Sequence, residues 1–151
     1  MGSIQTISGG IAQDQRGSIR FVNDFNLTAV KRFYIIENSS TEIVRGWRAH
    51  RTEQRWFFIL EGGFSMSYVK VDDWDQPSRE LEVSEISWRA SDNSVVHVPA
   101  GFATAFRALE ARSKLLVFAD FGIEHAKDDD FTYALDYFYG FNSNKSARLN
   151  L

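Results

Sequence analysis

The fold of this chain is decided by the stretch Arg55-Trp56-Phe57-Phe58-Ile59-Leu60, which Gly62-Gly63 separates from a second apolar run over residues 64–71. Aromatic and β-branched side chains favour the half-buried surface of a sheet, and the first run is apolar enough to lie in a core. Two such runs with glycines between them predict a β-hairpin. The core of the protein is therefore expected to consist of strands.

Runs of the same kind recur on both sides of this pair. We predict further strands over residues 18–22, 30–36, 42–50, 81–88, 95–98, 103–109 and 115–121, with turns at residues 92–93 and 110–114. Several short strands at this spacing indicate a sandwich or barrel rather than alternating strands and helices. One short helix is expected over residues 133–138, because Asp128, Asp129 and Asp130 would cap its start.

Size and charge narrow the class of protein. A chain of 151 residues is expected to form one domain over residues 1–151, with a core over about 14–140. Hydrophobic residues make up 44% and charged residues 25%, which is ordinary globular composition and excludes a disordered chain. The net charge of −3 gives no reason to expect nucleic acid or an acidic membrane surface as a partner.

The chain has no cysteine, which removes disulfides, thiolate catalysis and cysteine-based zinc sites together. This composition fits a reducing compartment. Residues 1–11 contain no basic residue followed by an apolar run, and no apolar stretch approaches the roughly 20 residues that span a bilayer. We therefore expect a cytoplasmic protein with no membrane association.

Residues 45–50, Arg-Gly-Trp-Arg-Ala-His, end one of the predicted strands. Successive side chains of a strand point to opposite faces, so Arg48 and His50 should share one face, and Trp47 and Ala49 the other. An imidazole that titrates near neutral pH, beside a permanent cation, is suited to moving a proton next to an anionic oxygen. The same pattern also fits an ordinary solvated strand end.

Four segments carry a resemblance to a known family. Residues 30–36 read Val-Lys-Arg-Phe-Tyr-Ile-Ile, and residues 45–51 read Arg-Gly-Trp-Arg-Ala-His-Arg. Residues 98–106 read Val-Pro-Ala-Gly-Phe-Ala-Thr-Ala-Phe, and residues 130–138 read Asp-Phe-Thr-Tyr-Ala-Leu-Asp-Tyr-Phe. In this order they resemble the cupin-fold nucleotide-sugar isomerases and epimerases. The resemblance is greatest to the 3,4-ketoisomerases acting on dTDP-4-keto-6-deoxyglucose and their WxcM-like relatives, and less to the dTDP-sugar 3,5-epimerases.

The resemblance implies an all-β, cupin-type jelly roll (a double-stranded β-helix) with a short C-terminal helix, and a homodimer. Its departures from the family pattern are informative. Arg48 stands where the ketoisomerases have the first of two histidines and where the epimerases have their general base. Because arginine stays protonated at physiological pH, Arg48 cannot be a base. Thr104 replaces the histidine of the epimerase motif, so His50 is the remaining acid/base candidate.

No metal or other cofactor is predicted. Many cupins bind a metal through three histidines and a glutamate, but here positions 48 and 104 are not histidines. The three histidines of the chain, His50, His97 and His125, are spread too widely in sequence to suggest such a site. A structural role is expected for His97, and no role is assigned to His125. The acidic runs at residues 72–73 and 128–130 are interpreted as solvated turns.

Under the family interpretation, His50 removes the proton from the carbon next to a sugar ketone. Arg48 stabilises an enediolate oxygen or binds a phosphate, and Tyr34 donates a proton. The expected substrate-binding residues are Arg32, Arg45, Arg55 and Thr104. Each also has a structural interpretation, as a surface arginine, a hydrogen-bonded strand-end histidine or a buried tyrosine. The four tryptophans are interpreted as packing residues.

The function predicted from these residues is a metal-independent isomerase or epimerase of a nucleotide-activated 4-keto-6-deoxy sugar, working through an enediolate in surface polysaccharide biosynthesis. The expected partner is therefore a small nucleotide sugar. The alternative belongs to another class: a catalytically inactive cupin that binds a nucleotide sugar, or another small ligand, as an accessory protein. The loss of the histidine at position 48 is the feature that keeps this alternative open.

Overall fold

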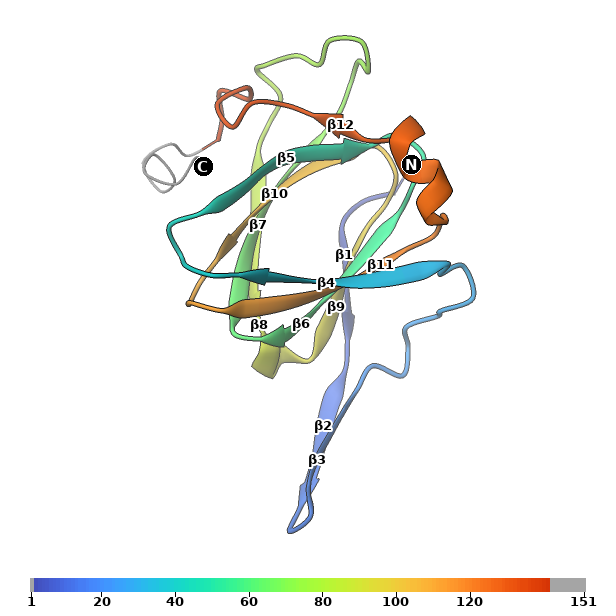
Figure 1. Cartoon of the computed structure of the whole chain (residues 1–151), viewed down its shortest axis with the longest axis vertical. Coiled ribbons are helices and arrows are strands. Elements are labelled where there is room, and N and C mark those ends of the chain that lie inside the picture. The colour runs from blue at the N-terminus through green and yellow to red at the C-terminus, as the bar shows by residue number, and fades with distance from the viewer. Residues whose placement is uncertain (1, 142–151) are drawn as a thin grey trace.

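A computed structural model describes residues 2–141, in which two five-stranded antiparallel sheets face each other (Figure 1). The first sheet has the order β1 (Gln5–Ser8), β9 (Ser94–Val98), β6 (Arg55–Glu61), β11 (Ser113–Ala119) and β4 (Arg32–Asn38). The second has the order β12 (Phe131–Thr132), β5 (Val44–His50), β10 (Phe102–Ala108), β7 (Gly63–Lys70) and β8 (Ser84–Arg89). The predicted all-β, cupin-type jelly roll is confirmed. Residues 1 and 142–151 of the expected domain lie outside the described residues.

The predicted hairpin between β6 and β7 is wrong. The two strands follow each other directly in sequence but pair in different sheets, β6 with β9 and β11, and β7 with β8 and β10. Gly62, with φ +74°, turns the chain from one sheet into the other, a conformation that favours glycine. Its carbonyl accepts from Ala90 N at 2.8 Å. Each strand finds better-matched partners far away in sequence, so the glycines mark a corner of the barrel.

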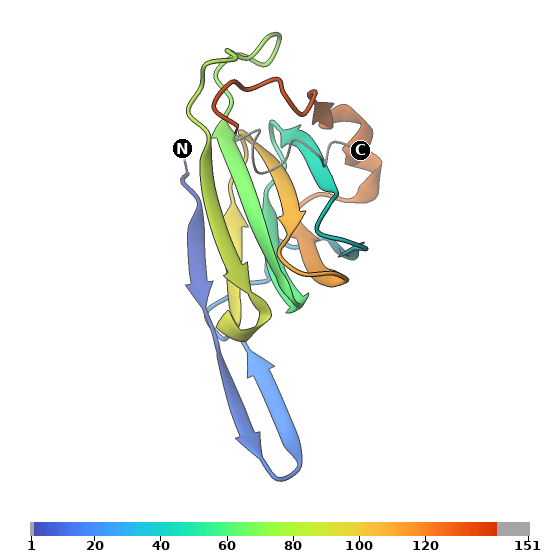
Figure 2. The ribbon, with the colours of Figure 1, turned by 90° about the vertical axis from the view of Figure 1, so that its left-hand side faces the viewer.

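The N-terminal region contains two strands that the sequence did not reveal, at residues 5–8 and 10–14, while the predicted strand at residues 18–22 is present as β3 (Gly17–Phe21). The sheet begins at Gln5, before the expected core boundary at residue 14, because β1 pairs with β9. β2 (Gly10–Asp14) and β3 then form a two-stranded arm, which projects away from the body of the molecule (Figures 1 and 2). Ile11, Ile19 and Phe21 are exposed on this arm.

The C-terminal region is a strap with little helix. The short 3-10 helix η2 (Ile123–Asp128) lies before the acidic run, not at residues 133–138 as predicted, and Phe131–Thr132 forms β12. A second 3-10 helix, η1, covers Ala90–Asp92. Trp47 Nε1 donates to the carbonyl of Leu135 at 3.1 Å, and Phe138 packs edge-on against the Trp47 ring. Through these contacts residues 131–141 pack across the outer face of β5. The segment over residues 133–138 therefore lies along that face and is not the predicted helix.

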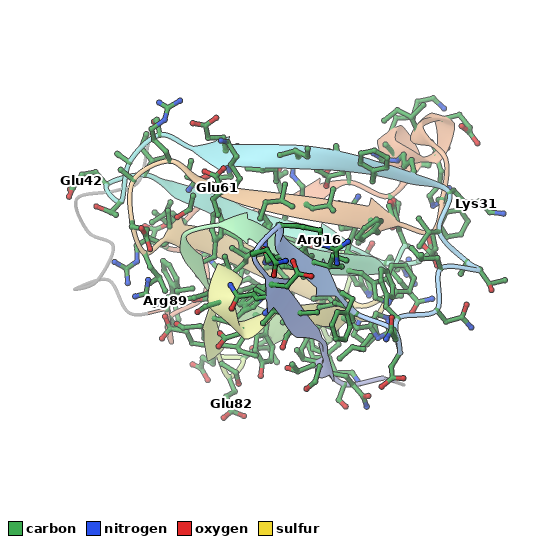
Figure 3. The ribbon with its side chains drawn as sticks, turned by 90° about the horizontal axis from the view of Figure 1, so that it is seen from below. Arg16, Lys31, Glu42, Glu61, Glu82 and Arg89 are labelled. Atoms are coloured by element: carbon green, nitrogen blue, oxygen red, sulfur yellow. The ribbon has the colours of Figure 1, made fainter. Side chains whose placement is uncertain are left out.

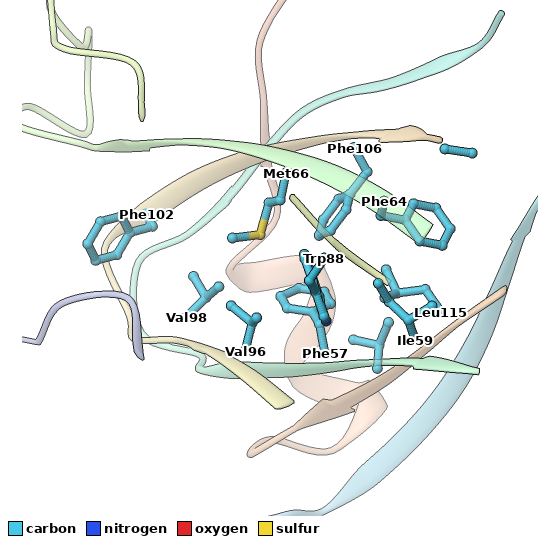
Figure 4. Packing of buried hydrophobic residues seen from close by; sticks show 12 residues of the cluster. Phe57, Ile59, Phe64, Met66, Trp88, Val96, Val98, Phe102, Phe106 and Leu115 are labelled. Atoms are coloured by element: carbon cyan, nitrogen blue, oxygen red, sulfur yellow. The ribbon is translucent and has the colours of Figure 1, made fainter. Parts of the chain in front are cut away.

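Apolar side chains fill one part of the space between the sheets (Figure 4). Alternate residues of β6, Phe57 and Ile59, point inward to meet Phe64 and Met66 of β7. Phe64 and Met66 have no exposed surface. We call this cluster the apolar half of the barrel; its buried members are Phe57, Ile59, Phe64, Met66, Trp88, Val96, Val98, Phe102, Phe106, Ala108, Leu115 and Val117.

The outer surfaces differ between the sheets. On β4 the side chains of Phe33 and Ile35 point outward and remain 65% and 55% exposed. Charged side chains lie around the rest of the surface, as the labelled residues of Figure 3 illustrate. Among the described residues, no helix has the length and apolar character needed to cross a bilayer.

Candidate active site

A cavity of about 700 Å³ opens between the sheets beside the apolar half. Strands β4, β5, β6 and β10 line it, together with residues of η2. The structure brings all seven of the predicted site residues to this one cavity: Arg32, Tyr34, Arg45, Arg48, His50, Arg55 and Thr104.

Strand alternation places most of these side chains. Arg48 and His50 face the cavity, whereas Trp47 and Ala49 belong to the packed cluster under the C-terminal strap, as predicted. A register shift between β5 and β10, at Thr104/Phe106, changes this alternation locally. Arg45 therefore also reaches the cavity, where its Nε donates to Asn38 Oδ1 at 2.7 Å.

His50 has a defined ring orientation. Its Nδ1 lies 2.8 Å from the carbonyl oxygen of Asp129, which can only accept, so Nδ1 carries the hydrogen and Nε2 keeps a free lone pair in the neutral ring. Burial lowers the pKa of His50 below its ordinary value of 6.5, and the charge of Arg55 lowers it further. The carbonyl of Asp129 and the charges of Glu53 and Asp129 oppose this shift of the pKa. The imidazole is therefore neutral, and able to accept a proton, at neutral pH.

Arg48 is not the cation that acts most on His50. Its side chain is 59% exposed and pairs with Asp130, with Nε and Oδ1 3.4 Å apart. Arg55 is 7% exposed, and it is the arginine whose charge acts on the pKa of the imidazole. His50 is thus influenced by a permanent cation, as predicted, but that cation is Arg55 from β6 of the other sheet.

Arg55 also organises Tyr34. Its Nη1 donates to the Tyr34 hydroxyl oxygen at 2.6 Å, and its Nε donates to Glu53 Oε2 at 3.0 Å. The guanidinium of Arg32 lies 5.3 Å from the centre of the Tyr34 ring and 3.6 Å from Glu53 Oε2. Because Arg55 donates to the Tyr34 oxygen, the hydroxyl hydrogen of Tyr34 is directed elsewhere and is available to a ligand.

Sequence reasoning missed two acidic residues of this region. Glu53 is 1% exposed and lies on the turn between β5 and β6. Asp129 is 2% exposed, so the interpretation of residues 128–130 as a solvated run was wrong at this position. Its carboxylate accepts from the backbone N–H groups of Arg51, Thr52 and Glu53 at 2.7 to 3.2 Å. No local pattern could reveal this contact, because the partners lie 76 to 78 residues apart.

These hydrogen bonds give Asp129 an anchoring role. Burial by itself raises the pKa of the carboxyl, but the backbone N–H groups of Glu53, Arg51 and Thr52 and the Thr52 hydroxyl outweigh it, so the pKa lies below 3.8. Asp129 thus holds the turn after β5 through its carboxylate and orients His50 through its carbonyl.

His50, Glu53 and Asp129 place potential ligand atoms within 4.8 Å of one another. Of the four carboxylate oxygens, only Glu53 Oε1 has no partner in the described part of the chain, so a metal ion would find one free oxygen beside His50, fewer than the three or four ligands of a typical site. Both oxygens of Asp129 already accept hydrogen bonds, and Glu53 Oε2 faces the guanidiniums of Arg55 and Arg32. The cluster is better described as an ion-pair and hydrogen-bond network around a histidine.

The other histidines lie away from the cavity. His97 stacks on Trp56, with ring centres 5.0 Å apart and an angle of 15°, and its Nε2 contacts Gln54 Oε1 at 2.7 Å. His125 stacks on Phe121, and its Nε2 lies 2.9 Å from the Thr52 hydroxyl. Neither residue lines the cavity, and their contacts are those of packing residues.

The fold is a cupin-type jelly roll, with a partly buried histidine and several arginines on the wall of an interior cavity. Within that fold class, a family model matches residues 3–142, and the chain belongs to the family described as FdtA: WxcM-like, C-terminal. The recognition made from the four sequence segments is confirmed. A search of curated proteins finds no match.

Solved structures with the same fold include sugar-nucleotide enzymes. The WlaRB TDP-quinovose 3,4-ketoisomerase from Campylobacter jejuni is 15% identical, with a TM-score of 0.67 over 92% of this chain and 99% of that one. A mutant 3,4-ketoisomerase QdtA from Thermoanaerobacterium thermosaccharolyticum, in complex with TDP-4-keto-6-deoxyglucose, is 17% identical, with a TM-score of 0.66 over 90% and 91%.

An epimerase is equally similar in fold. The dTDP-6-deoxy-D-glucose-3,5-epimerase RmlC from Legionella pneumophila, in complex with dTDP-4-keto-L-rhamnose, is 16% identical, with a TM-score of 0.70 over 92% of this chain and 77% of that one. At such identities the likeness establishes the fold. The reaction must be argued from the side chains of the cavity.

Proposed function

We propose that this protein is a metal-independent isomerase or epimerase of a nucleotide-activated 4-keto-6-deoxy sugar, which serves surface polysaccharide biosynthesis. The observation that carries the proposal is His50, a neutral imidazole on a cavity wall that also presents Arg55 and the Tyr34 hydroxyl. Membership of the WxcM-like family supports it. So do the sugar-nucleotide ligands in two structures of the same fold.

In the proposed ketoisomerase reaction, His50 removes the proton from C3 of the sugar. The C3–H electron pair forms a C3=C4 double bond, and the ketone oxygen at C4 becomes an enediolate oxygen. Return of a proton to C4, with loss of the proton from O3 and gain of one at O4, moves the carbonyl to C3. A positioned acid/base group typically contributes about 10²- to 10⁴-fold to the rate.

Charge stabilisation must supply much of the remaining acceleration. Arg55 is the best-placed cation for the enediolate oxygen, because its side chain is shielded from solvent and lies close enough to His50 to lower the pKa of that imidazole. Tyr34, bound to Arg55, is the proposed proton donor. Arg48, at the more exposed part of the cavity wall, suits a phosphate oxygen. Arg32, Arg45 and Thr104 are proposed as further substrate contacts.

The decisive experiment offers the purified protein a panel of dTDP- and other nucleotide-activated 4-keto-6-deoxy sugars in deuterium oxide. Proton abstraction predicts deuterium at C3 of the returned substrate or of an epimerised product, and at C4 of a ketoisomerised product. Neither product nor deuterium uptake with any member of the panel would remove the support for an enzyme.

An accessory, catalytically inactive cupin remains the second candidate, because arginine at position 48 replaces a histidine of the ketoisomerase pattern. Titration of dTDP and dTDP-sugars against the wild type and His50→Asn distinguishes the two functions. Binding by both proteins, with deuterium exchange in neither, favours the accessory role. Binding by both, with exchange in the wild type alone, favours the enzyme.

We also propose a homodimer located in the cytoplasm. Apolar side chains are exposed both on the β2–β3 arm, as Ile19, and on β4, as Phe33 and Ile35, and a second copy could cover them. The lack of cysteine agrees with a reducing compartment. Sedimentation of the wild type and of Phe33→Asp tests the dimer, which the charge should weaken.

A further inference from the structure

We infer that Glu53 is a positioning residue of the proposed reaction, which holds Arg55 against Tyr34 and counterbalances the charge of Arg55 next to His50. This inference rests on the proposed function, since it concerns the same cavity. Glu53 has no counterpart among the family residues recognised in the sequence.

Glu53 connects groups from three different strands. Its Oε2 lies 3.0 Å from Arg55 Nε of β6 and 3.6 Å from Arg32 Nη2 of β4. One of its carboxylate oxygens also lies within 4.8 Å of a ring nitrogen of His50, at the end of β5. Arg55 in turn donates to the Tyr34 hydroxyl oxygen at 2.6 Å. Glu53 therefore lies directly beside His50, the proposed base, and is connected to Tyr34, the proposed acid, through Arg55.

The burial of this network explains why its centre is a carboxylate. The side chain of Glu53 is fully buried, while those of Arg55 and Arg32 are 9% and 20% exposed. Arg32 and Arg55 both lie at the Tyr34 ring, where little water is present to screen their repulsion. The carboxylate of Glu53, which contacts both guanidiniums, offsets that repulsion. Without this carboxylate, Arg55 would lose the contact to Nε that fixes its planar group.

Glu53 also acts on the base. Arg55, from β6, lowers the pKa of His50, whereas Glu53 and Asp129 raise it. Other titratable or charged groups nearby are Arg32, which faces Glu53, Arg48, which is paired with Asp130, and His125, which contacts Thr52 and Asp129. Loss of Glu53 removes one opposing charge, so the pKa of His50 falls further.

One oxygen of Glu53 is not explained by structural bonding. Oε1 is buried, and it has no hydrogen-bond partner among the described residues. A buried carboxylate oxygen without a partner is costly to the fold. The carboxylate is therefore better explained by its effect on the charges of the cavity than by a contribution to the fold.

The test compares Glu53→Gln with Glu53→Asp in the full chain. Glu53→Gln is expected to lower kcat about 10²-fold, the effect of misplaced catalytic groups, while KM changes little. The acidic limb of the kcat/KM profile should move to lower pH. Glu53→Asp keeps the charge and should leave that limb near its wild-type position. Glu61→Gln is the matched control, because Glu61 ends β6, the strand that follows Glu53, and pairs with Lys114 at the exposed surface.

A titration of the His50 ring by NMR, without substrate, keeps this inference separate from the proposed function. Glu53→Gln should lower the titration midpoint of His50, and Glu61→Gln should not, whether or not a sugar substrate has been found. If Glu53→Gln does not fold, a wild-type midpoint for His50 in Glu53→Asp supports the inference, and a lowered one overturns it. An unchanged kcat and midpoint in folded Glu53→Gln, or a rise in KM alone, also overturns it.

Discussion

The apolar half of the barrel and the cavity beside it share strands β6 and β10, yet only the cavity wall holds charged side chains. On β6 the inward-facing residues run from Arg55 through Phe57 to Ile59, so one strand passes from the charged wall into the packed core. On β4 the sequence of inward residues is Arg32, Tyr34 and Ile36. The depth of the site is therefore set by the position along each strand at which inward residues change from charged to apolar.

This division has an energetic meaning. The apolar half removes large side chains from water, which stabilises the fold by roughly 1.5–3 kcal/mol for each fully buried residue. The cavity wall holds charges away from water, an arrangement that opposes folding unless the charges are paired. Proteins commonly break the rules of packing at functional sites and offset the cost elsewhere. Within this single barrel, the apolar half stabilises the fold and the cavity wall holds the charges proposed to act on a substrate.

The largest effect is expected from a change in the charged half. His50→Asn should lower turnover of the substrate by about 10²- to 10⁴-fold, because it removes the proposed base while keeping a polar side chain of similar size. Binding of dTDP should persist. His97→Asn is the control, since His97 stacks on Trp56 outside the cavity. Equal losses in the two variants would contradict the assignment of His50.

In the apolar half, the corresponding change should act on stability. Phe64→Ala removes a ring with no exposed surface, and truncations of this kind cost about 3–5 kcal/mol in the free energy of unfolding. Urea denaturation measures the loss. Phe33→Ala serves as the reference, because Phe33 is 65% exposed and its truncation should fall within about 0.5 kcal/mol. A small loss for Phe64→Ala would show that the packed cluster is not the main source of stability.

Acid should weaken the protein through two partly buried histidines, His50 and His97. Burial lowers the pKa of His50 and of His97 below 6.5, and Arg55 adds to the shift for His50. The unfolded chain therefore binds more protons than the folded one below about pH 6.5, and the free energy of unfolding falls as the pH drops from there. Urea titrations above and below this pH measure the fall. It should be smaller in His50→Asn, and an identical fall would exclude His50 as a source.

The smallest effect is expected at the exposed part of the cavity wall. Arg48→Gln breaks a solvent-exposed pair with Asp130, and such pairs contribute about 0–1 kcal/mol to stability. If Arg48 binds a phosphate oxygen, the affinity for dTDP should fall in the same variant, and its dependence on salt should weaken. Calorimetry at two salt concentrations measures both. A large loss of stability would mean that Arg48 belongs to the buried network.

Local patterns predicted the strands well where apolar residues alternate or cluster, as over residues 55–60 and 115–121. They failed where an element depends on distant partners. β1 has little apolar character and forms because β9 offers an edge. Likewise, residues 133–138 are drawn into a strap by Trp47, 88 residues before Leu135 in sequence. The glycines after β6 predicted a turn correctly, but only the pairing of both strands showed that it joins two sheets.

The sequence by itself determined that Arg48 and His50 share one face of their strand, because a period of two along a strand is a local property that the order of residues fixes. It did not determine that Arg45 joins them, since the register shift between β5 and β10 breaks that period. Only the tertiary structure decided which charges meet in the cavity. Arg55, rather than Arg48, acts on His50, and Glu53 and Asp129 join them. Electrostatic interactions depend on distance through space and on burial, and both arise only when the two sheets pack together.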